Sequence, residues 1–328
     1  MKKVRIYGTL GPSCKDEQTL AQMFREGMDS IRLNLSHTTL AEAAGLIAAY
    51  RNAARACGVK PGLLINMQGP ELRIGRLPAP LRLEEGALVG TDALPFPEEV
   101  KNVLSGAPAG REILLDDGRI LLAAESPERL RVVRGGVLES RKSVALPGCR
   151  IRTPALTAAD RVNLAGAKSC GVTAVMQPFV RGPEDLIDLR AAMEQAGCGD
   201  LRLLAKIENL EGLRALDSII PYCDEIVIAR GDLGNAMDLW ELPAVQKRIA
   251  AVCRKAGRDF MVVTQMLDSM THRRVPTRAE LSDIFNAVLD GAASVMVTGE
   301  TASGEYPADV IRYLSRTVRE AEAFLTHG

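Results

Sequence analysis

The stretch Leu201–Gly234, LRLLAKIENLEGLRALDSIIPYCDEIVIARGDLG, contains an apolar strand, a polar end, an amphipathic helix, a second apolar strand and a second polar end. This order is typical of a parallel strand-helix-strand unit. Side chains alternate along a strand, so Lys206 and Glu208 are expected to leave the first strand on one side, at its C-terminal end. Asp232 follows the second strand. We therefore expect two carboxylates and an ammonium at one edge of the sheet.

Carboxylate oxygens without a nearby His or Cys suit a hard cation such as Mg²⁺ or Mn²⁺, with a phosphate or carboxylate of a substrate as a further ligand. A solvated rim of charges is the alternative interpretation for a single Lys-x-Glu sequence. The rest of the chain decides between the two.

The same alternation runs through most of the 328 residues. Eight strands are predicted, at 4–10, 29–35, 62–66, 172–176, 201–207, 225–229, 260–264 and 294–297. Eight helices alternate with them, at 16–27, 40–57, 157–169, 183–196, 210–220, 244–256, 278–289 and 308–324. This pattern predicts an α/β fold with parallel strands, as a closed (β/α)8 TIM barrel. An open, doubly wound sheet is the competing fold.

Between residues 71 and 153 the helical pattern disappears. Short strand-like pieces at 81–83, 112–115, 120–123 and 130–133 alternate with Pro, Gly and charged turns. Such a segment predicts a small β domain, or cap, inserted into a larger domain. We expect residues 1–70 to form the first part of the barrel, 71–153 the inserted cap and 154–328 the second part of the barrel.

The composition narrows the class of protein. The 41 basic and 41 acidic side chains cancel, so no nucleic-acid or membrane partner is expected. The apolar runs are only strand-length and the N-terminus has no signal-peptide pattern, so we expect a cytoplasmic protein. Seven cysteines are scattered without a Cys-x-x-Cys pair, which favours free thiols over a zinc or disulfide framework.

In a TIM barrel the functional residues lie at the C-terminal ends of the strands. The polar residues at those predicted ends are Thr9, Arg32, Asn34, Ser36, His37, Asn66, Gln68, Gln177, Lys206, Glu208, Arg230, Asp232, Thr264, Gln265, Thr298 and Glu300. Arg and Lys beside a divalent ion stabilise a transferring phosphoryl group, whose charge spreads over its oxygens. The concentration of such residues on one rim favours a functional site over a solvated surface.

Nine segments, in the same order, resemble those of the pyruvate kinase family. They are 9–13 (TLGPS), 32–37 (RLNLSH), 69–73 (GPELR), 115–118 (LDDG), 205–209 (AKIEN), 229–234 (ARGDLG), 264–270 (TQMLDSM), 276–280 (PTRAE) and 298–302 (TGETA). The resemblance covers essentially the whole chain. It implies phosphoryl transfer between phosphoenolpyruvate and ADP, which gives pyruvate and ATP.

The resemblance also implies roles for individual residues. The catalytic set is Lys206, Arg32, Arg73, Thr264, Thr298 and Glu300. The substrate-binding set is Ala229, Arg230, Gly231, Asp232 and Thr264. The nucleotide-binding set is Asn34, His37, Arg73, Asp117 and Lys142. Glu208 and Asp232 would bind Mg²⁺ or Mn²⁺ together with phosphoenolpyruvate, and Lys206 would contact the transferring phosphoryl group and the enolate.

Asn34, Ser36, Asn66 and the Met67 carbonyl occupy the positions that bind a monovalent cation in the family, usually K⁺. The family sequence Asp-Thr-Lys-Gly-Pro-Glu is replaced here by residues 66–71, NMQGPE, so one carboxylate and one ammonium are absent. Cation affinity depends on the charge of the ligands. We therefore expect K⁺ to matter little.

Three functions remain open. The first is a phosphotransferase acting on phosphoenolpyruvate and ADP, possibly with an altered enol or acceptor substrate. The second is a metal-dependent lyase or aldolase that stabilises the enolate of a 2-oxo acid without a nucleotide. The third is a non-catalytic sensor of a phosphorylated metabolite. The sequence also predicts the absence of the family's C-terminal regulatory domain, and a homodimer formed through barrel helices.

Overall fold

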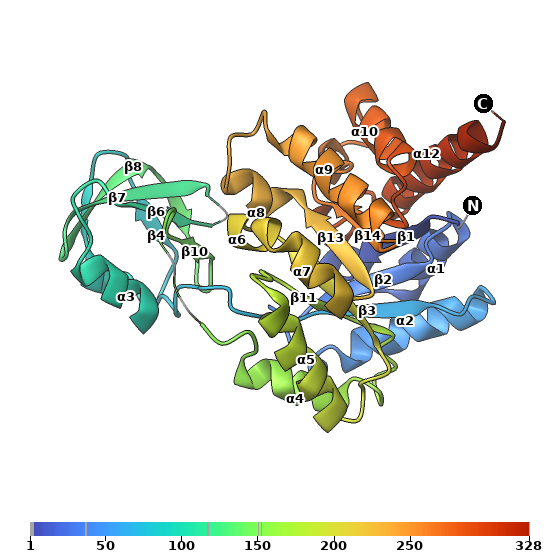
Figure 1. Cartoon of the computed structure of the whole chain (residues 1–328), viewed down its shortest axis with the longest axis horizontal. Coiled ribbons are helices and arrows are strands. Elements are labelled where there is room, and N and C mark those ends of the chain that lie inside the picture. Colours follow the sequence, from blue (N-terminus) through green and yellow to red (C-terminus); the bar gives the residue numbers. More distant parts are fainter. Residues whose placement is uncertain (1–2, 37, 117, 150, 152, 328) are drawn as a thin grey trace. The chain divides into compact units, whose positions relative to one another are not determined.

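The computed structural model describes all residues except 1–2, 37, 117, 150, 152 and 328. The chain divides into two compact units, Met1–Gly69 with Ala155–Gly328, and Pro70–Pro154. The N-terminal and C-terminal parts of the chain thus belong to one unit, and the middle forms the other (Figure 1). Within the described residues, no helix combines the length and the apolar composition that crossing a membrane requires.

The first unit contains a closed barrel. Its strands among the described residues are β1 (Arg5–Thr9), β2 (Ser30–Asn34), β3 (Gly62–Asn66), β11 (Ala174–Gln177), β12 (Arg202–Ile207), β13 (Glu225–Ala229), β14 (Asp259–Val263) and β15 (Ser294–Met296). They pair in the order β1-β15-β14-β13-β12-β11-β3-β2, and all pairs are parallel. The predicted closed barrel is confirmed, and the open sheet is excluded.

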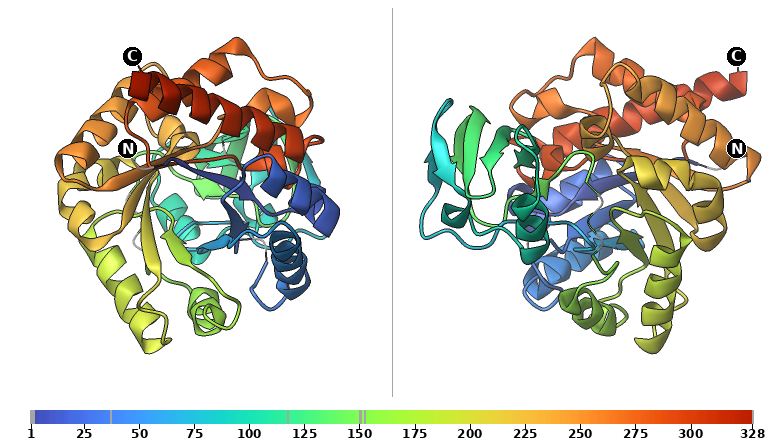
Figure 2. Two further views of the ribbon diagram at one scale, coloured as in Figure 1. Left: turned by 90° about the vertical axis from the view of Figure 1, so that its right-hand side faces the viewer. Right: turned by 60° about the vertical axis from the view of Figure 1, so that its left-hand side comes forward.

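Helices surround these strands (Figure 2). They are α1 (Glu17–Arg25), α2 (Ala44–Ala56), α4 (Ala158–Gly166), α5 (Pro183–Gln195), α6 (Leu210–Arg214), α7 (Leu216–Ile219), α8 (Arg230–Asn235), α9 (Leu242–Lys255), α10 (Arg278–Leu289), α11 (Gly299–Ala302) and α12 (Pro307–His327). Short 3-10 turns occur at η1 (Pro12–Cys14), η3 (Ile220–Tyr222) and η4 (Asp268–Thr271). The predicted helix at 210–220 is two short helices, and α8 and α11 were not predicted as helices.

Local sequence explains where several helices begin. The Thr277 side chain accepts a hydrogen bond from the Glu280 backbone N–H, and Glu280 caps in return, which starts α10. Thr157 and Asp160 form the same capping box at the start of α4. Each box satisfies two N–H groups that a helix end otherwise leaves without a partner.

The barrel strands are buried on both faces. All five residues of β13 are buried, which is why the segment is an unbroken apolar run after its first residue. Tyr7, Leu64, Met176 and Met261 belong to a cluster of barrel-strand residues that is separate from the larger core shared by strands and helices. A buried strand residue therefore packs in one cluster or the other, according to the face of the strand on which it lies.

The second unit has its own core and two antiparallel sheets. Its elements are β4 (Leu81–Leu83), β5 (Leu88–Gly90), η2 (Thr91–Ala93), α3 (Glu98–Ser105), β6 (Glu112–Leu115), β7 (Ile120–Ser126), β8 (Arg129–Arg134), β9 (Gly136–Leu138) and β10 (Val144–Ala145). The described strands pair as β10-β6-β7-β8-β5 and as β4-β9. The prediction that helices are absent here is wrong, because Val100 and Leu104 of α3 are buried in this core at helical spacing.

Glu225, the first residue of β13, is a completely buried carboxylate at the N-terminal end of the barrel strands. Arg202 of β12 and Arg5 of β1 each donate to its Oε2, at 2.8 Å and 3.0 Å. The Ser294 hydroxyl of β15 donates to its Oε1. Burial opposes the charge on Arg202, yet Glu225 beside it keeps the arginine pKa raised. One carboxylate therefore connects four of the barrel strands.

Replacing Glu225 by Ala should lower the free energy of unfolding by about 3 kcal/mol, because it leaves two arginines without their shared partner. Urea denaturation measures this change. As a control, Asp200→Ala removes the Asp200–Lys168 pair, whose 2.8 Å contact is solvent-exposed. That variant should shift the midpoint of urea denaturation far less than Glu225→Ala, because a solvent-exposed ion pair contributes little to stability. Equal effects of the two variants would contradict the role given to Glu225.

Candidate active site

A buried ion pair lies where β12 ends. Lys206 Nζ is 2.5 Å from Glu208 Oε1, and the Glu208 side chain is completely buried. The other carboxylate oxygen accepts a hydrogen bond of 2.8 Å from the backbone N–H of Phe179. Oε1 receives no hydrogen bond of normal geometry from any described residue, and it pairs with the Lys206 ammonium. A buried carboxylate oxygen of this kind is suited to a cation.

Asp232 lies on the neighbouring strand connection. β12 pairs with β13, and Asp232 lies in the first turn of α8, which directly follows β13. The two carboxylates that the sequence predicts as metal ligands thus come from adjacent strand ends. Their oxygens fit Mg²⁺ or Mn²⁺. No group of three His, Cys, Asp or Glu side chains among the described residues could hold a metal, and Mg²⁺ accepts water and substrate oxygens as its remaining ligands.

The segments after β14 and β15 are held together by Glu300, which is buried in α11. Its Oε2 accepts from the Thr298 backbone N–H at 2.7 Å and lies 3.3 Å from the Thr298 hydroxyl. Its Oε1 accepts from the Leu267 N–H at 3.3 Å. Thr264 lies close to Gly231 across the neighbouring strand end, since a Cβ at Gly231 would be 3.1 Å from the Thr264 methyl group.

Arg32 is buried on β2, next to Thr9 of β1 in the register. In the ring of strands, β3 and β11 lie between β2 and β12. Arg32 and Lys206 therefore come from different sides of the same set of strand ends.

The Asn66 side chain occupies the centre of the predicted K⁺ site. Its Nδ2 donates to Asn34 Oδ1 at 3.1 Å and to the Met67 carbonyl at 3.0 Å. Its Oδ1 is buried without a hydrogen-bond partner in the part of the chain that the structure describes. The reverse amide orientation would place an oxygen against two acceptors. Two oxygens predicted to bind K⁺ thus already accept hydrogen bonds, and Ser36 is a half-buried neighbour whose N–H lies 3.4 Å from Asn34 Oδ1.

Two predicted nucleotide-binding residues lie in the inserted unit. Arg73 donates to Glu71 Oε2 through Nε and Nη2, at 2.9 Å and 2.6 Å, and to the Arg141 carbonyl at 2.8 Å. Lys142 forms an ion pair of 2.9 Å with Asp116, and this hydrogen-bonded contact raises the lysine pKa. His37 and Asp117, also predicted for the nucleotide, lie outside the described residues.

Sequence reasoning missed two carboxylates that organise the strand ends. Asp160 is completely buried and accepts from the backbone N–H groups of Gln68 at 2.7 Å and Gly69 at 3.1 Å. Its capping-box position after Thr157 was a usable signal. Asp283 of α10 forms an ion pair of 2.7 Å with Arg230, and no local pattern marks that contact.

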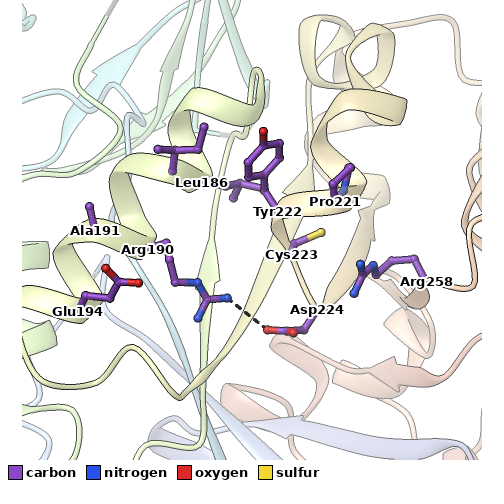
Figure 3. Close-up of a pocket in the computed structure, with 10 residues that line it drawn as sticks. Leu186, Arg190, Ala191, Glu194, Pro221, Tyr222, Cys223, Asp224 and Arg258 are labelled. Carbon is purple, nitrogen blue, oxygen red and sulfur yellow. Dashed lines mark hydrogen bonds and ion pairs between the residues drawn. The ribbon is translucent and has the colours of Figure 1, made fainter.

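A cavity of about 590 Å³ lies between α5 and η3 (Figure 3). Arg190, Tyr222, Asp224 and Arg258 line it, and Arg190 is 3.5 Å from Asp224. Asp224 and Arg258 come just before β13 and β14, so this cavity belongs to the N-terminal ends of the strands. It is separate from the candidate site at their C-terminal ends.

Known proteins resemble this chain over nearly its whole length. The family model described as "Pyruvate kinase, barrel domain" matches residues 1–311. The chain belongs to the pyruvate kinase family. Relatives named "Pyruvate kinase" include those of Geobacillus stearothermophilus, 33% identical over 99% of this chain, and Methylorubrum extorquens, 36% identical over 98%. The chain spans 58% of the length of the first relative and 69% of the second.

Activity of the unaltered protein should depend little on K⁺, because Asn66 supplies a hydrogen-bond donor where the family places a carboxylate. Asn66→Asp should raise the dependence, since a charge contact at an effective dielectric near 20 is worth about 4 kcal/mol before desolvation. Turnover in K⁺ is compared with turnover in tetramethylammonium at constant ionic strength. Asn66→Ala, which adds no charge, is the control. An absolute K⁺ requirement of the unaltered protein would refute this interpretation.

Proposed function

We propose that this protein transfers a phosphoryl group between phosphoenolpyruvate and ADP with the help of Mg²⁺ or Mn²⁺. The observation that carries the proposal is the buried Lys206–Glu208 pair at the end of β12, next to Asp232 after β13. Family membership supports the same activity. In the forward direction the bond between phosphorus and the enol oxygen breaks, and a bond forms to an oxygen of the ADP β-phosphate.

The residues at the strand ends would have different roles in the phosphoryl transfer. A divalent cation held by Glu208 and Asp232 would supply positive charge for the carboxylate and phosphate of the substrate. The Lys206 ammonium would donate to the phosphoryl oxygens as they gain charge and would then stabilise the enolate. Ala229, Arg230 and Gly231 would present backbone N–H groups to the substrate carboxylate.

The remaining steps concern protonation and the nucleotide. The enolate carbon would take up a proton near Thr264, along a path that includes Thr298 and Glu300. Arg32 and Arg73 would contact phosphate oxygens, and Asn34, His37, Asp117 and Lys142 would contact the nucleotide. We place the protein in the cytoplasm, where its seven free thiols would stay reduced.

A metal-dependent lyase or aldolase is the second candidate, since the same pair could stabilise the enolate of a 2-oxo acid. The predicted nucleotide-binding residues of the inserted unit, Arg73 and Lys142, favour the kinase, because a lyase has no nucleotide to bind. Phosphoenolpyruvate is incubated with Mg²⁺, with and without ADP, while pyruvate and ATP are measured independently. We expect pyruvate and ATP in equal amounts when ADP is present, and neither product without ADP. Pyruvate and inorganic phosphate without ATP would show hydrolysis and would contradict the kinase. Cleavage of a 2-oxo acid without turnover of phosphoenolpyruvate would favour the lyase, and binding without any turnover would favour a sensor.

Lys206→Ala should lower kcat by about a thousandfold while nucleotide binding changes little, because the ammonium acts mainly on charge that develops in the transition state. Steady-state kinetics and nucleotide titration measure the two effects. Lys247→Ala is the control, since Lys247 pairs with Asp290 on an outer helix face and should leave the rate unchanged. A loss of substrate affinity alone would make Lys206 a binding residue.

We also propose a homodimer, formed through the outer face near α9. Leu239 and Trp240 precede this helix and are 69% and 79% exposed, and exposed aromatic side chains often dominate interfaces. Trp240→Asp should convert the dimer to a monomer in light scattering. Ile187→Asp, on the exposed face of α5, should leave the dimer intact. A monomeric unaltered protein would refute the proposal.

A further inference from the structure

The Arg230 side chain connects three elements of the barrel. Its Nε and Nη2 donate to the Thr264 carbonyl at 3.2 Å and 2.7 Å, just past the end of β14. Its Nη1 donates to Asp283 of α10 at 2.7 Å and lies 3.4 Å from Gln246 Oε1 of α9. The Arg230 side chain is only 11% exposed. Its guanidinium is thus directed at the backbone and at α10.

The carbonyl that Arg230 holds belongs to an unusual backbone segment. Thr264 has a φ of 80° and Gln265 a φ of 54°, so two consecutive L residues adopt the left-handed region. A β-branched residue rarely adopts this conformation, which persists only where neighbouring groups enforce it. Gly231 leaves room for the Thr264 methyl group, since a Cβ there would lie 3.1 Å away. The segment is therefore held against Gly231 from one side and by Arg230 from the other.

We infer that Asp283 is a positioning residue for Thr264, acting through Arg230. The Asp283 carboxylate neutralises the nearly buried guanidinium and fixes its plane, so that two of its N–H groups converge on the Thr264 carbonyl. Without Asp283, the guanidinium would move toward water and release the carbonyl. The backbone at Thr264 and Gln265 would then leave the left-handed region, and the Thr264 side chain would move away from its position at the strand end. The consequence for the rate rests on the proposed function, in which Thr264 lies beside the enolate carbon.

The first test compares three variants in the full-length protein. Asp283→Ala should lower kcat by about a hundredfold with little change in KM for phosphoenolpyruvate, as expected for a displacement of about 1 Å in a catalytic site. Asp283→Glu should restore much of the rate. Asp290→Ala removes an ion pair of the same 2.7 Å length at the end of the same helix, and it should leave kcat unchanged. Equal losses in Asp283→Ala and Asp290→Ala would overturn the inference.

The second test uses the backbone conformation directly. Glycine adopts positive φ without strain, so the rate of the single variant Gln265→Gly is measured as the reference for the double variant. Added to Asp283→Ala, the same substitution should recover about tenfold of the lost rate, because it removes part of the strain that Arg230 no longer opposes. Light scattering follows the oligomeric state of each variant. A lost rate that Gln265→Gly does not restore would overturn the inference.

A third measurement separates this inference from the proposed function. In hydrogen exchange followed by mass spectrometry, Asp283→Ala should speed exchange of the amides at Met266 and Leu267, while Asp290→Ala should not. This result is expected whether or not the protein turns over phosphoenolpyruvate. If the unaltered protein is inactive, the proposed function fails and hydrogen exchange still decides the inference. Unchanged exchange in Asp283→Ala would overturn it.

Discussion

The closure of the barrel depends on a buried charge that four strands share. Glu225 lies at the N-terminal ends of the strands and receives hydrogen bonds from β1, β12 and β15. A buried carboxylate is costly unless its partners are in place, so strand arrangements that separate these partners are disfavoured. The interaction thereby selects the closed ring. Once the ring is closed, the opposite ends of the strands must meet, and this brings Lys206, Glu208 and Asp232 to one rim.

Most of the barrel could be predicted from the sequence, because long apolar runs bounded by Gly and Pro specify buried parallel strands. β3 and β13 lie where the pattern placed them. Short elements were missed for a physical reason. β10 has two residues and α8 six, so neither repeats its pattern often enough to be recognised, and both depend on contacts that are distant in sequence. The helix α3 was missed because its eight residues lie between Pro-rich and Gly-rich turns.

The candidate site was predictable only in part. Lys206 and Glu208 follow from strand alternation, which needs no tertiary information. The contact between Arg230 and Asp283 joins residues that are distant in the chain, and no local pattern announces it. The burial of a charged side chain is equally invisible to the sequence. Glu225 stands at the start of a strand, where a charge is normally solvated, yet it is completely buried. Long-range ion pairs and strained backbone angles therefore had to come from the structure.

Asp160 has a consequence for how this barrel tolerates its insertion. The carboxylate accepts hydrogen bonds from Gln68 and Gly69, before the inserted unit, and from Thr157, after it. One side chain of the barrel thus holds together the two chain segments between which Pro70–Pro154 is inserted. Each doubling in length of such a loop costs only about 0.6 kcal/mol of closure entropy. Evolution could therefore lengthen, shorten or exchange the inserted unit while the register of the barrel strands stayed the same.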